Sequence, residues 1–305
     1  MKWLTGTTPA ILKQLQAEAL RTSTDNQQVE ARVKVILEAV REKGDQALKE
    51  YSEQFDQVVL QELLISKEQM EQAYQRVEKP VLEALEAAKA NIISYHQKQK
   101  QNNFMDAEKN GVIRGQLVLP LERVGVYVPG GTAAYPSSVL MNVLPAKIAG
   151  VAEIIMVTPP SAAGVADVIL AAAKIAGVDR IFQIGGAQAI AALAYGTETV
   201  PKVDKIVGPG NQYVATAKKQ VFGLVGIDMV AGPSEIGIIA DATANPAYIA
   251  ADLLSQAEHD ILARAILVTN SQELGTKVAA EVEKQLQILP RKSFAQKAWD
   301  DYVQI

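Results

Sequence analysis

Glycine-rich turns are the first features of this sequence whose residue types and spacing could support chemistry. Three such turns, at 129–132, 185–187 and 208–211, each separate a short β-branched run from a helical stretch. Glycine lets a ligand approach the backbone closely, and the free N–H groups at a helix N-terminus attract anions. A turn between a strand and a helix also needs glycine for structural reasons alone. Several such turns with polar neighbours favour a small-molecule site; together with a fourth turn before a strand, they contribute Thr132, Gln188, Asn211 and Ser234.

A second candidate is the pair Gln256 and His259, which are three residues apart at the end of an expected helix. This spacing places both side chains on one helix face. An amide oxygen and an imidazole nitrogen can share one metal ion, with the histidine as the stronger ligand. A histidine in a last helical turn can instead cap carbonyl groups and complement the helix dipole. Because two ligands leave a zinc site open, a metal site here requires further ligands from elsewhere.

Missing motifs narrow the possible reaction classes. The sequence has no G-x-x-x-x-G-K-[ST] motif and no G-x-G-x-x-G motif after a strand. A P-loop nucleotidase is therefore not expected, and a nicotinamide cofactor would be held without the usual pyrophosphate fingerprint. The G-x-S-x-G motif of α/β-hydrolases is also absent. Cysteine does not occur, which excludes a disulfide scaffold, thiol catalysis and cysteine-ligated zinc.

Composition argues against nucleic-acid and membrane partners. The 305 residues include 30 Lys and Arg against 34 Asp and Glu, and only 5% are aromatic. Neither a broad basic face nor a stacking platform for single strands is expected from these values. Apolar runs reach about nine residues, whereas a spanning helix needs about 20, and the N-terminus lacks the apolar core of a secretory signal. We therefore expect a cytoplasmic protein that binds neither nucleic acid nor membranes.

Two kinds of segment must position the candidate residues. The first hundred residues have helical periodicity, with a capping box at Ser66 and Gln69 and a helix start at Pro80. From about residue 112, β-branched runs alternate with alanine-rich helical stretches. The expected strands are 124–128, 154–158, 180–184, 205–207, 235–240 and 265–269, and the expected helices are 137–149, 163–176, 187–195, 212–222, 246–259 and 274–286. Apolar strands that alternate with helices predict a parallel sheet covered on both faces.

The expected fold class is therefore α/β, with Rossmann-like parallel-sheet units, helices on both faces and a helical N-terminal segment before them. We expect three parts along the chain. Residues 1–111 form the helical segment and pack with residues 233–305. Residues 112–232 form a Rossmann-like domain, and residues 233–305 begin a second α/β domain.

Five motifs of this sequence resemble those of the histidinol dehydrogenase family, in the same order and at the same spacing. They are RVGVYVPGG at 123–131, GGAQAIAAL at 185–193, VDKIVGPGN at 203–211, AGPSE at 231–235 and DLLSQAEH at 252–259. The resemblance implies an NAD-dependent, zinc-containing oxidoreductase of histidine biosynthesis. Such an enzyme oxidises L-histidinol to L-histidine through an aldehyde and acts as a homodimer with a shared active site.

The resemblance also assigns roles to individual residues. By it, Tyr127, Gln188 and Asn211 contact NAD, and Ser234 contacts the substrate. Gln256 and His259 are implied zinc ligands that also border the substrate. In the family, a Glu–His pair serves as general acid and base, and it would follow Ile305. No residue of this chain is therefore assigned as catalytic.

This departure from the family pattern leads us to expect a truncated chain that, alone, neither oxidises histidinol nor holds zinc tightly. Two alternatives remain open. One is a related NAD-dependent amino-alcohol dehydrogenase, and the other is a catalytically inert fragment that binds a ligand or a metal. The DNA that follows codon 305 would discriminate between a truncation and a natural fragment.

Overall fold

The computed structural model describes residues 1–108, 110–130, 135–231, 235–259 and 263–305, with only the backbone described for 17–26. The chain divides into two compact units. We call residues 27–231 the sheet unit, and residues 1–26 with 232–305 the terminal unit. Helix α1 (Thr8–Lys43) contributes residues to both units. No helix in the described part of the chain has the length and hydropathy needed to cross a membrane.

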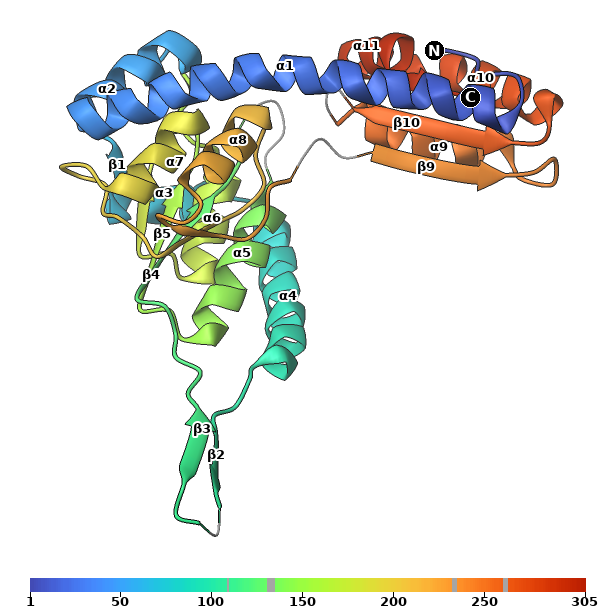
Figure 1. The fold of residues 1–305 in the computed structure, drawn as a ribbon. Coiled ribbons are helices and arrows are strands. Elements are labelled where there is room, and N and C mark those ends of the chain that lie inside the picture. Colours follow the sequence, from blue (N-terminus) through green and yellow to red (C-terminus); the bar gives the residue numbers. More distant parts are fainter. Residues whose placement is uncertain (109, 131–134, 232–234, 260–262) are drawn as a thin grey trace. The chain divides into compact units, whose positions relative to one another are not determined.

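A six-stranded sheet forms the centre of the sheet unit (Figure 1). Its order is β1-β6-β5-β4-β7-β8, and only β1 runs antiparallel to its neighbour. The strands are β1 (Leu64–Ile65), β4 (Arg123–Tyr127), β5 (Glu153–Val157), β6 (Arg180–Phe182), β7 (Lys205–Val207) and β8 (Gly226–Ile227). From β4 the chain first winds through β5 to β6 and then returns to β7, so the winding reverses between β4 and β7. This is the strand order of a Rossmann-type sheet.

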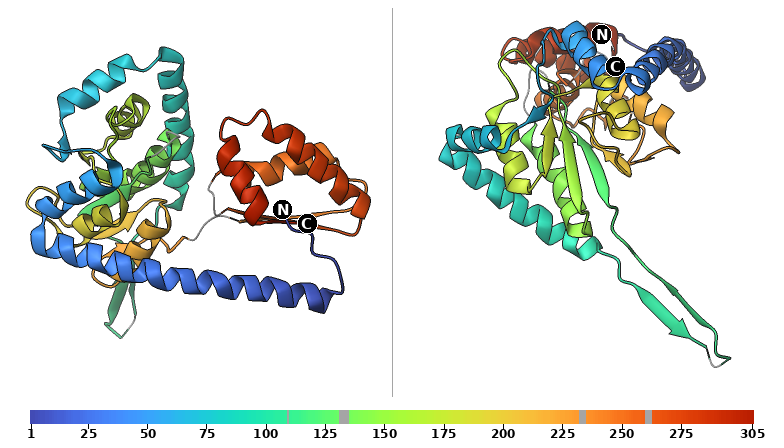
Figure 2. Two further views of the ribbon diagram at one scale, coloured as in Figure 1. Left: turned by 90° about the horizontal axis from the view of Figure 1, so that it is seen from above. Right: turned by 90° about the vertical axis from the view of Figure 1, so that its left-hand side faces the viewer.

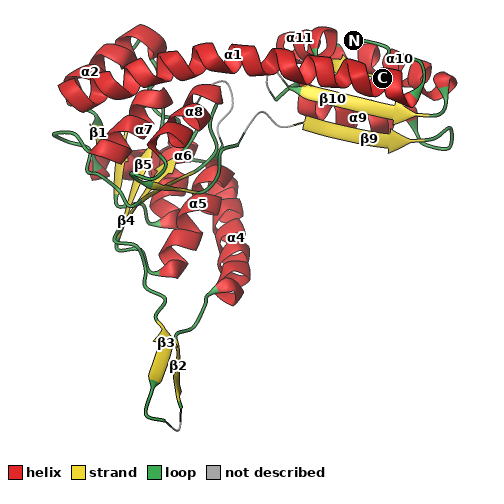
Figure 3. Cartoon of the chain, in the orientation of Figure 1, coloured by secondary structure: helices red, strands yellow, loops and turns green. Residues whose placement is uncertain are grey.

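Helices cover both faces of this sheet, as the apolar strands predict (Figure 3). In β5, Ile155 and Val157 belong to one core, whereas Ile154 and Met156 belong to the other. The first core includes residues of α1, α2 (Asp45–Tyr51), α7 (Gly186–Tyr195) and α8 (Gln212–Val221). The second includes residues of α3 (Lys67–Arg76), α4 (Lys79–His96), α5 (Pro136–Ala149) and α6 (Asp167–Ala176). The expected α/β class with a parallel sheet is confirmed.

Helices α2, α3 and α4 and the second half of α1 belong to the sheet unit, whereas residues 1–26 group with residues 232–305. The predicted capping box starts α3: Ser66 Oγ accepts from the N–H of Gln69 at 3.1 Å, and the Gln69 side chain accepts from the N–H of Ser66 at 2.7 Å. Arg76 at the end of this helix pairs with Asp167 of α6 at 2.6 Å. A parallel sheet needs both faces covered, and α3 and α4 supply part of that cover.

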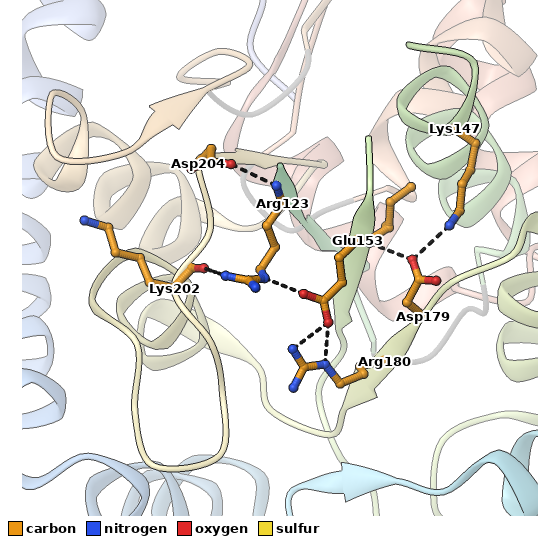
Figure 4. A network of polar contacts seen from close by, with 8 residues as sticks. Arg123, Lys147, Glu153, Asp179, Arg180, Lys202 and Asp204 are labelled. Carbon is orange, nitrogen blue, oxygen red and sulfur yellow. Dashed lines mark hydrogen bonds and ion pairs between the residues drawn. The ribbon is translucent and has the colours of Figure 1, made fainter. Parts of the chain in front are cut away.

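A charged network lies at the amino ends of the strands (Figure 4). Glu153 of β5 accepts hydrogen bonds from Arg123 of β4 and Arg180 of β6. Burial raises the pKa of Glu153, but the two guanidinium groups outweigh that effect and lower it overall. Nearby, Asp179 accepts from Lys147 and from the N–H of Ile154, both at 2.8 Å. Because these groups satisfy one another, the network joins the strands and is not a candidate site.

A hairpin of β2 (Phe104–Ala107) and β3 (Ile113–Gln116) projects from the sheet unit (Figure 2). The expected end of the first part, at residue 111, falls inside this hairpin. All eight strand residues are exposed, so no buried face imposes the alternation by which strands are recognised. Asp106 and Arg114 stand opposite each other in the ladder and form an ion pair at 3.0 Å.

The terminal unit has its own parallel sheet, in the order β11-β10-β9. Its elements are β9 (Glu235–Ala240), α9 (Pro246–Ala257), β10 (Arg264–Thr269), α10 (Gln272–Leu286), α11 (Lys292–Asp301) and β11 (Val303–Gln304). The N-terminal residues extend this sheet, because the N–H of Lys2 donates to the carbonyl of Val303 at 2.9 Å. One core joins the three helices to the sheet. Ile239 of β9 stays 88% exposed.

Candidate functional site

The carboxyl ends of the parallel strands in the sheet unit form the candidate ligand-binding edge. In open α/β sheets, ligands bind outside these ends at the point where the winding reverses. Here that point lies between the end of β4 at Tyr127 and the end of β7 at Val207. Three residues expected to contact NAD lie on the elements that meet this edge. Tyr127 ends β4, Gln188 is in the first turn of α7, and Asn211 directly precedes α8.

Tyr127 is a buried structural member of this edge, with 2% of its surface exposed. Its hydroxyl oxygen accepts a hydrogen bond at 3.1 Å from the N–H of Gly186, the first residue of α7. Burial raises the pKa of Tyr127 to about 12, and the nearby charge of Asp56 adds to this effect. The tyrosine therefore remains neutral at physiological pH and holds the glycine turn before α7 in place.

Gln188 is buried at this edge, and Asn211 caps a helix there. Gln188 is 2% exposed and lies among the buried residues of α7. Asn211 is exposed, and its side-chain oxygen accepts the N–H groups of Tyr213 at 3.0 Å and Val214 at 3.1 Å. This is an N-cap for α8, worth about 1 kcal/mol in typical helices. A ligand contact of Asn211 would therefore use its amide nitrogen.

A buried ion pair that the sequence analysis missed fixes the turn between β7 and α8. Lys218 is 3% exposed, and its Nζ donates to Asp228 Oδ1 and, at 3.1 Å, to the carbonyl of Gly208. Asp228 Oδ2 accepts the N–H of Gly208 at 2.9 Å. Both peptide groups of Gly208 are thus held by one charged pair. The available signal was a lysine at a position that continues the buried face of α8, four residues after Val214.

Gly208 itself can only be glycine. Its φ is +113°, and a Cβ built on it would lie 2.1 Å from the carbonyl oxygen of Tyr127. The turn after β7 therefore packs directly against the end of β4. This close approach brings together the two strand ends on either side of the reversal point.

A second polar feature of this edge was also missed by the sequence analysis. The π-helical segment η1 (Ser52–Asp56) follows α2. Ser52 Oγ and Asp56 Oδ2 are buried and have no hydrogen-bond partner in the described part of the chain. Burial raises the pKa of Asp56 to about 6. A buried polar group without a partner typically costs about 1–3 kcal/mol of folding stability. Each of these two groups is therefore expected to destabilise the folded protein.

Asp56→Asn is expected to change how stability depends on pH. Because its pKa is about 6 in the folded protein and 3.8 in the reference state, folded Asp56 binds its proton more tightly than unfolded Asp56. Its contribution to stability therefore falls as pH rises from about 4 to about 6 and stays low above that. The variant should gain stability relative to the unaltered protein across this window, measured by urea unfolding at several pH values.

The matched control for this prediction is Glu53→Gln, which removes one negative charge from an exposed position of the same segment. If Asp56→Asn and the unaltered protein kept a constant difference in unfolding free energy between pH 4 and pH 8, the assigned pKa would be wrong. Tyr127 on β4 is the titratable neighbour that could also respond, but its pKa of about 12 lies outside this range.

The pair Gln256 and His259 lies at the end of α9 in the terminal unit. Gln256 is in the last turn of α9, and the N–H of His259 donates to the Gln256 carbonyl at 3.1 Å. His259 is exposed, and its own carbonyl accepts from Arg291 at 3.3 Å. Among the described residues, no group of three or more His, Cys, Asp or Glu side chains is placed to hold a metal ion. These residues thus supply two candidate ligands and no third.

The remaining candidate residues fall in parts of the chain that the structure does not describe. Ser234, the expected substrate contact, lies outside the described residues, and so does Thr132 of the first glycine turn. Their expected roles stay predictions.

Known proteins resemble this chain over nearly its whole length. The sequence pattern of the histidinol dehydrogenase family matches residues 19–305. Histidinol dehydrogenase from Streptococcus mutans is 65% identical over 295 residues, which cover 97% of this chain and 69% of the relative. The Listeria innocua enzyme is 62% identical over 305 residues, covering 100% of this chain and 71% of the relative. A crystal structure of histidinol dehydrogenase from Elizabethkingia anophelis matches with a TM-score of 0.80 and 40% identity, covering 91% of this chain and 64% of that one.

Proposed function

The chain belongs to the histidinol dehydrogenase family of oxidoreductases, and we propose that it acts in the NAD-dependent oxidation of L-histidinol to L-histidine. It spans about two-thirds of the length of the relatives compared, 69% of the first and 64% of the solved structure. The observation that carries the proposal is the placement of Tyr127, Gln188 and Asn211 at one sheet edge, where the winding of the sheet reverses. That edge is the usual position of a dinucleotide in such folds.

The proposed reaction has two oxidation steps. In the first, the substrate alcohol would lose a hydride from its carbon and a proton from its hydroxyl group, which leaves the aldehyde. In the second, water would add to the aldehyde, and the resulting hydrate would lose a second hydride and two protons to become the carboxylate. When bound, NAD supplies the hydride acceptor. The residues of this chain bind and orient the substrate and NAD. The general acid and the general base are not assigned to any of them.

The position of the edge suits a dinucleotide, but the edge offers few groups that would hold it tightly. The edge lies where the winding of the sheet reverses, which is the usual place of a dinucleotide. No G-x-G-x-x-G fingerprint follows a strand in this sequence to hold the pyrophosphate. We therefore infer that NAD binds with modest affinity and contacts Tyr127, Gln188 and Asn211.

We propose Gln256 and His259 as two of the ligands of a zinc ion, and Ser234 as a substrate contact. An amide oxygen and an imidazole nitrogen are suitable zinc donors, but zinc sites use about four. The described residues do not complete that set, so no step of the reaction is derived through the metal. A redox-inert ion would hold the substrate rather than carry the hydride. We further propose a cytoplasmic homodimer with a shared active site.

NADH formation from L-histidinol tests the proposed function. The product of the gene that encodes this sequence is purified, and NADH and histidine are measured together. We expect two NADH for each histidine, with L-histidinol preferred over other amino alcohols. Oxidation of a different amino alcohol in preference would indicate a related dehydrogenase, and binding of zinc or NAD without any turnover would indicate a binding protein.

His259→Ala is expected to lower the zinc affinity of that protein by more than the roughly 10–100-fold typical of losing an outer-shell partner. Gln256→Ala should have a smaller effect in the same direction, because a neutral amide is the weaker ligand. Bound zinc is measured by elemental analysis after dialysis. Glu258→Gln is the matched control, since it changes a neighbouring side chain that is not a proposed ligand. Unchanged zinc content in His259→Ala would rule out the proposed metal role.

A further inference from the structure

The hairpin of β2 and β3, which we call the arm, lies in a segment that gathers exposed apolar side chains (Figure 2). All described residues from 101 to 122 are exposed. Of the 25 exposed large apolar side chains in the described part of the chain, eight lie in the short stretch from Phe104 to Leu121. Large contiguous apolar patches on a protein surface mark interaction sites. This gathering points to such a site on the arm.

The register of the two strands gives the arm two different faces. Side chains alternate between the faces along each strand, and residues that stand opposite each other in the ladder share a face. Met105 stands opposite Gly115, and Ala107 stands opposite Ile113. These four residues form one face without a polar side chain, which we call the apolar face. Met105 is 76% exposed and Ile113 is 67% exposed, so this face is open to water.

The opposite face of the arm is charged. It carries Asp106 and Arg114, which form an ion pair at 3.0 Å, and Arg114 also pairs with Glu108 at 2.7 Å. Phe104 and Gln116 stand opposite each other on the same face. The arm is therefore amphipathic, with the charges of its two strands confined to one side.

The uncovered apolar face leaves the arm itself weakly supported. A two-stranded hairpin is at best marginally stable in water unless it packs against another element. No residue of β2 or β3 is buried. Gly115 has no room for a side chain, because a Cβ there would lie 2.5 Å from the carbonyl oxygen of Phe104. The apolar face therefore stays open beside Met105, where a side chain of another surface can fit.

We propose that the apolar face of the arm packs against the same face of a second copy of this chain, about a twofold axis. The inference rests on the proposed homodimer and names a surface through which its subunits meet. A twofold contact uses the same patch on both subunits, so the patch must be complementary to itself. The apolar face meets this requirement because it holds no charge, and two copies bury neither like charges nor unpaired ions. The ion pairs of Arg114 remain on the outer sides of the two arms, in water.

The contact extends beyond the two strands. A standard interface takes about 20–30 residues from each partner, and four strand residues supply only part of that number. Leu117 and Leu119 follow Gly115 at the same two-residue spacing, and both are exposed. They continue the contact along the chain toward β4.

Sedimentation velocity of the protein purified from the gene that encodes this sequence tests the surface. We expect the double variant with Met105→Ser and Ile113→Ser to raise the dissociation constant of the dimer by about 10- to 100-fold, as for truncation of central side chains in an interface. Phe104→Ser is the matched control, because Phe104 precedes Met105 and is exposed on the charged face. It should leave the dissociation constant almost unchanged. Urea unfolding of each variant shows that the fold is retained.

Cross-linking gives a second and independent measurement. The sequence contains no cysteine, so a single introduced thiol can be linked only to the same thiol of another copy. Treated with a short bismaleimide, Ile113→Cys should give covalent dimers. Gln116→Cys, on the charged face of the same strand, should not. Equal yields from these two variants would contradict packing through the apolar face.

The outcomes separate this inference from the proposed function. A dimer with the same dissociation constant in the double serine variant would overturn the surface and leave the homodimer intact. An unaltered protein that is monomeric at micromolar concentration would overturn both, whereas the proposed reaction is tested separately by NADH formation. Co-sedimentation with phosphatidylcholine vesicles that the double variant loses would assign the face to a lipid surface and would also overturn the inference.

Discussion

Replacing Lys218 with methionine is expected to lower the free energy of unfolding by about 3 kcal/mol. Removal of one partner from a buried ion pair typically costs about 3–5 kcal/mol, because the other charge is left uncompensated. The lower end applies here, since the Asp228 side chain keeps 31% of its surface exposed. Methionine preserves the length and apolar stem of the lysine, so packing in α8 changes little. Urea unfolding monitored by circular dichroism measures the loss.

Lys219→Met is the matched control for this change. Lys219 is the next residue of the same helix, its side chain is 60% exposed, and it pairs with Glu30 on the surface. Exposed pairs contribute about 0–1 kcal/mol, so this variant should remain close to the unaltered protein. The double variant with Lys218→Met and Asp228→Asn should lose less unfolding free energy than Lys218→Met alone, because no uncompensated charge remains. Equal losses for the two lysine variants would show that Lys218 is not the buried support described above.

Gly208→Ala is expected to cost at least about 3 kcal/mol of stability. A non-glycine residue at a φ of +113° pays a backbone cost on the order of 1–3 kcal/mol. The added methyl group would also meet the Tyr127 carbonyl oxygen at 2.1 Å, and a backbone atom cannot move aside cheaply. The turn must therefore shift, which separates its peptide groups from Lys218 and Asp228. Affinity for NAD should fall with stability, because the same turn leads into Asn211.

Gly223→Ala isolates the conformational part of that cost. Gly223 has a similar φ of +99°, but a Cβ there would meet no atom within 4 Å. The difference in unfolding free energy between the two alanine variants therefore measures the collision with Tyr127. If both variants lost the same amount, the close approach of the β7–α8 turn to β4 would be excluded.

The sequence was informative where burial imposes a pattern. Strands β4, β5 and β7 are apolar because helices cover both faces of the sheet, and their positions follow directly from short β-branched runs. Once the strands are parallel, their carboxyl ends must share one edge. The sequence alone is therefore sufficient to place Tyr127, Gln188 and Asn211 at the same edge of the sheet.

The features that the sequence did not predict depend on contacts between distant residues or on very short segments. The helical periodicity of the first hundred residues does not show that α2 ends at Tyr51 and that a π-helical turn follows. One turn is too short for a periodic pattern to separate the two helix types. The pairing of Lys218 with Asp228 depends on where β8 ends, and β8 is only two residues long. No local signal in the sequence marks that strand.

Local sequence patterns also could not predict how the chain divides into two units. The sequence of an amphipathic helix shows that one face is apolar, but it does not show which core that face will join. Residues of α3 and α4 such as Met70 and Leu85 are buried in the same core as Val126 of β4. Only residues 1–26 group with the C-terminal part.

The hairpin of β2 and β3 has a consequence for how the protein avoids aggregation. Its outer edges carry unpaired backbone groups in the described structure, beside the exposed side chains of Phe104 and Met105. Such an edge can recruit strands from other molecules. If two copies paired through the same strand in parallel and in register, Asp106 would lie beside Asp106, or Arg114 beside Arg114, which is unfavourable. The two charged residues therefore disfavour this kind of edge-to-edge association, beside apolar side chains that face water.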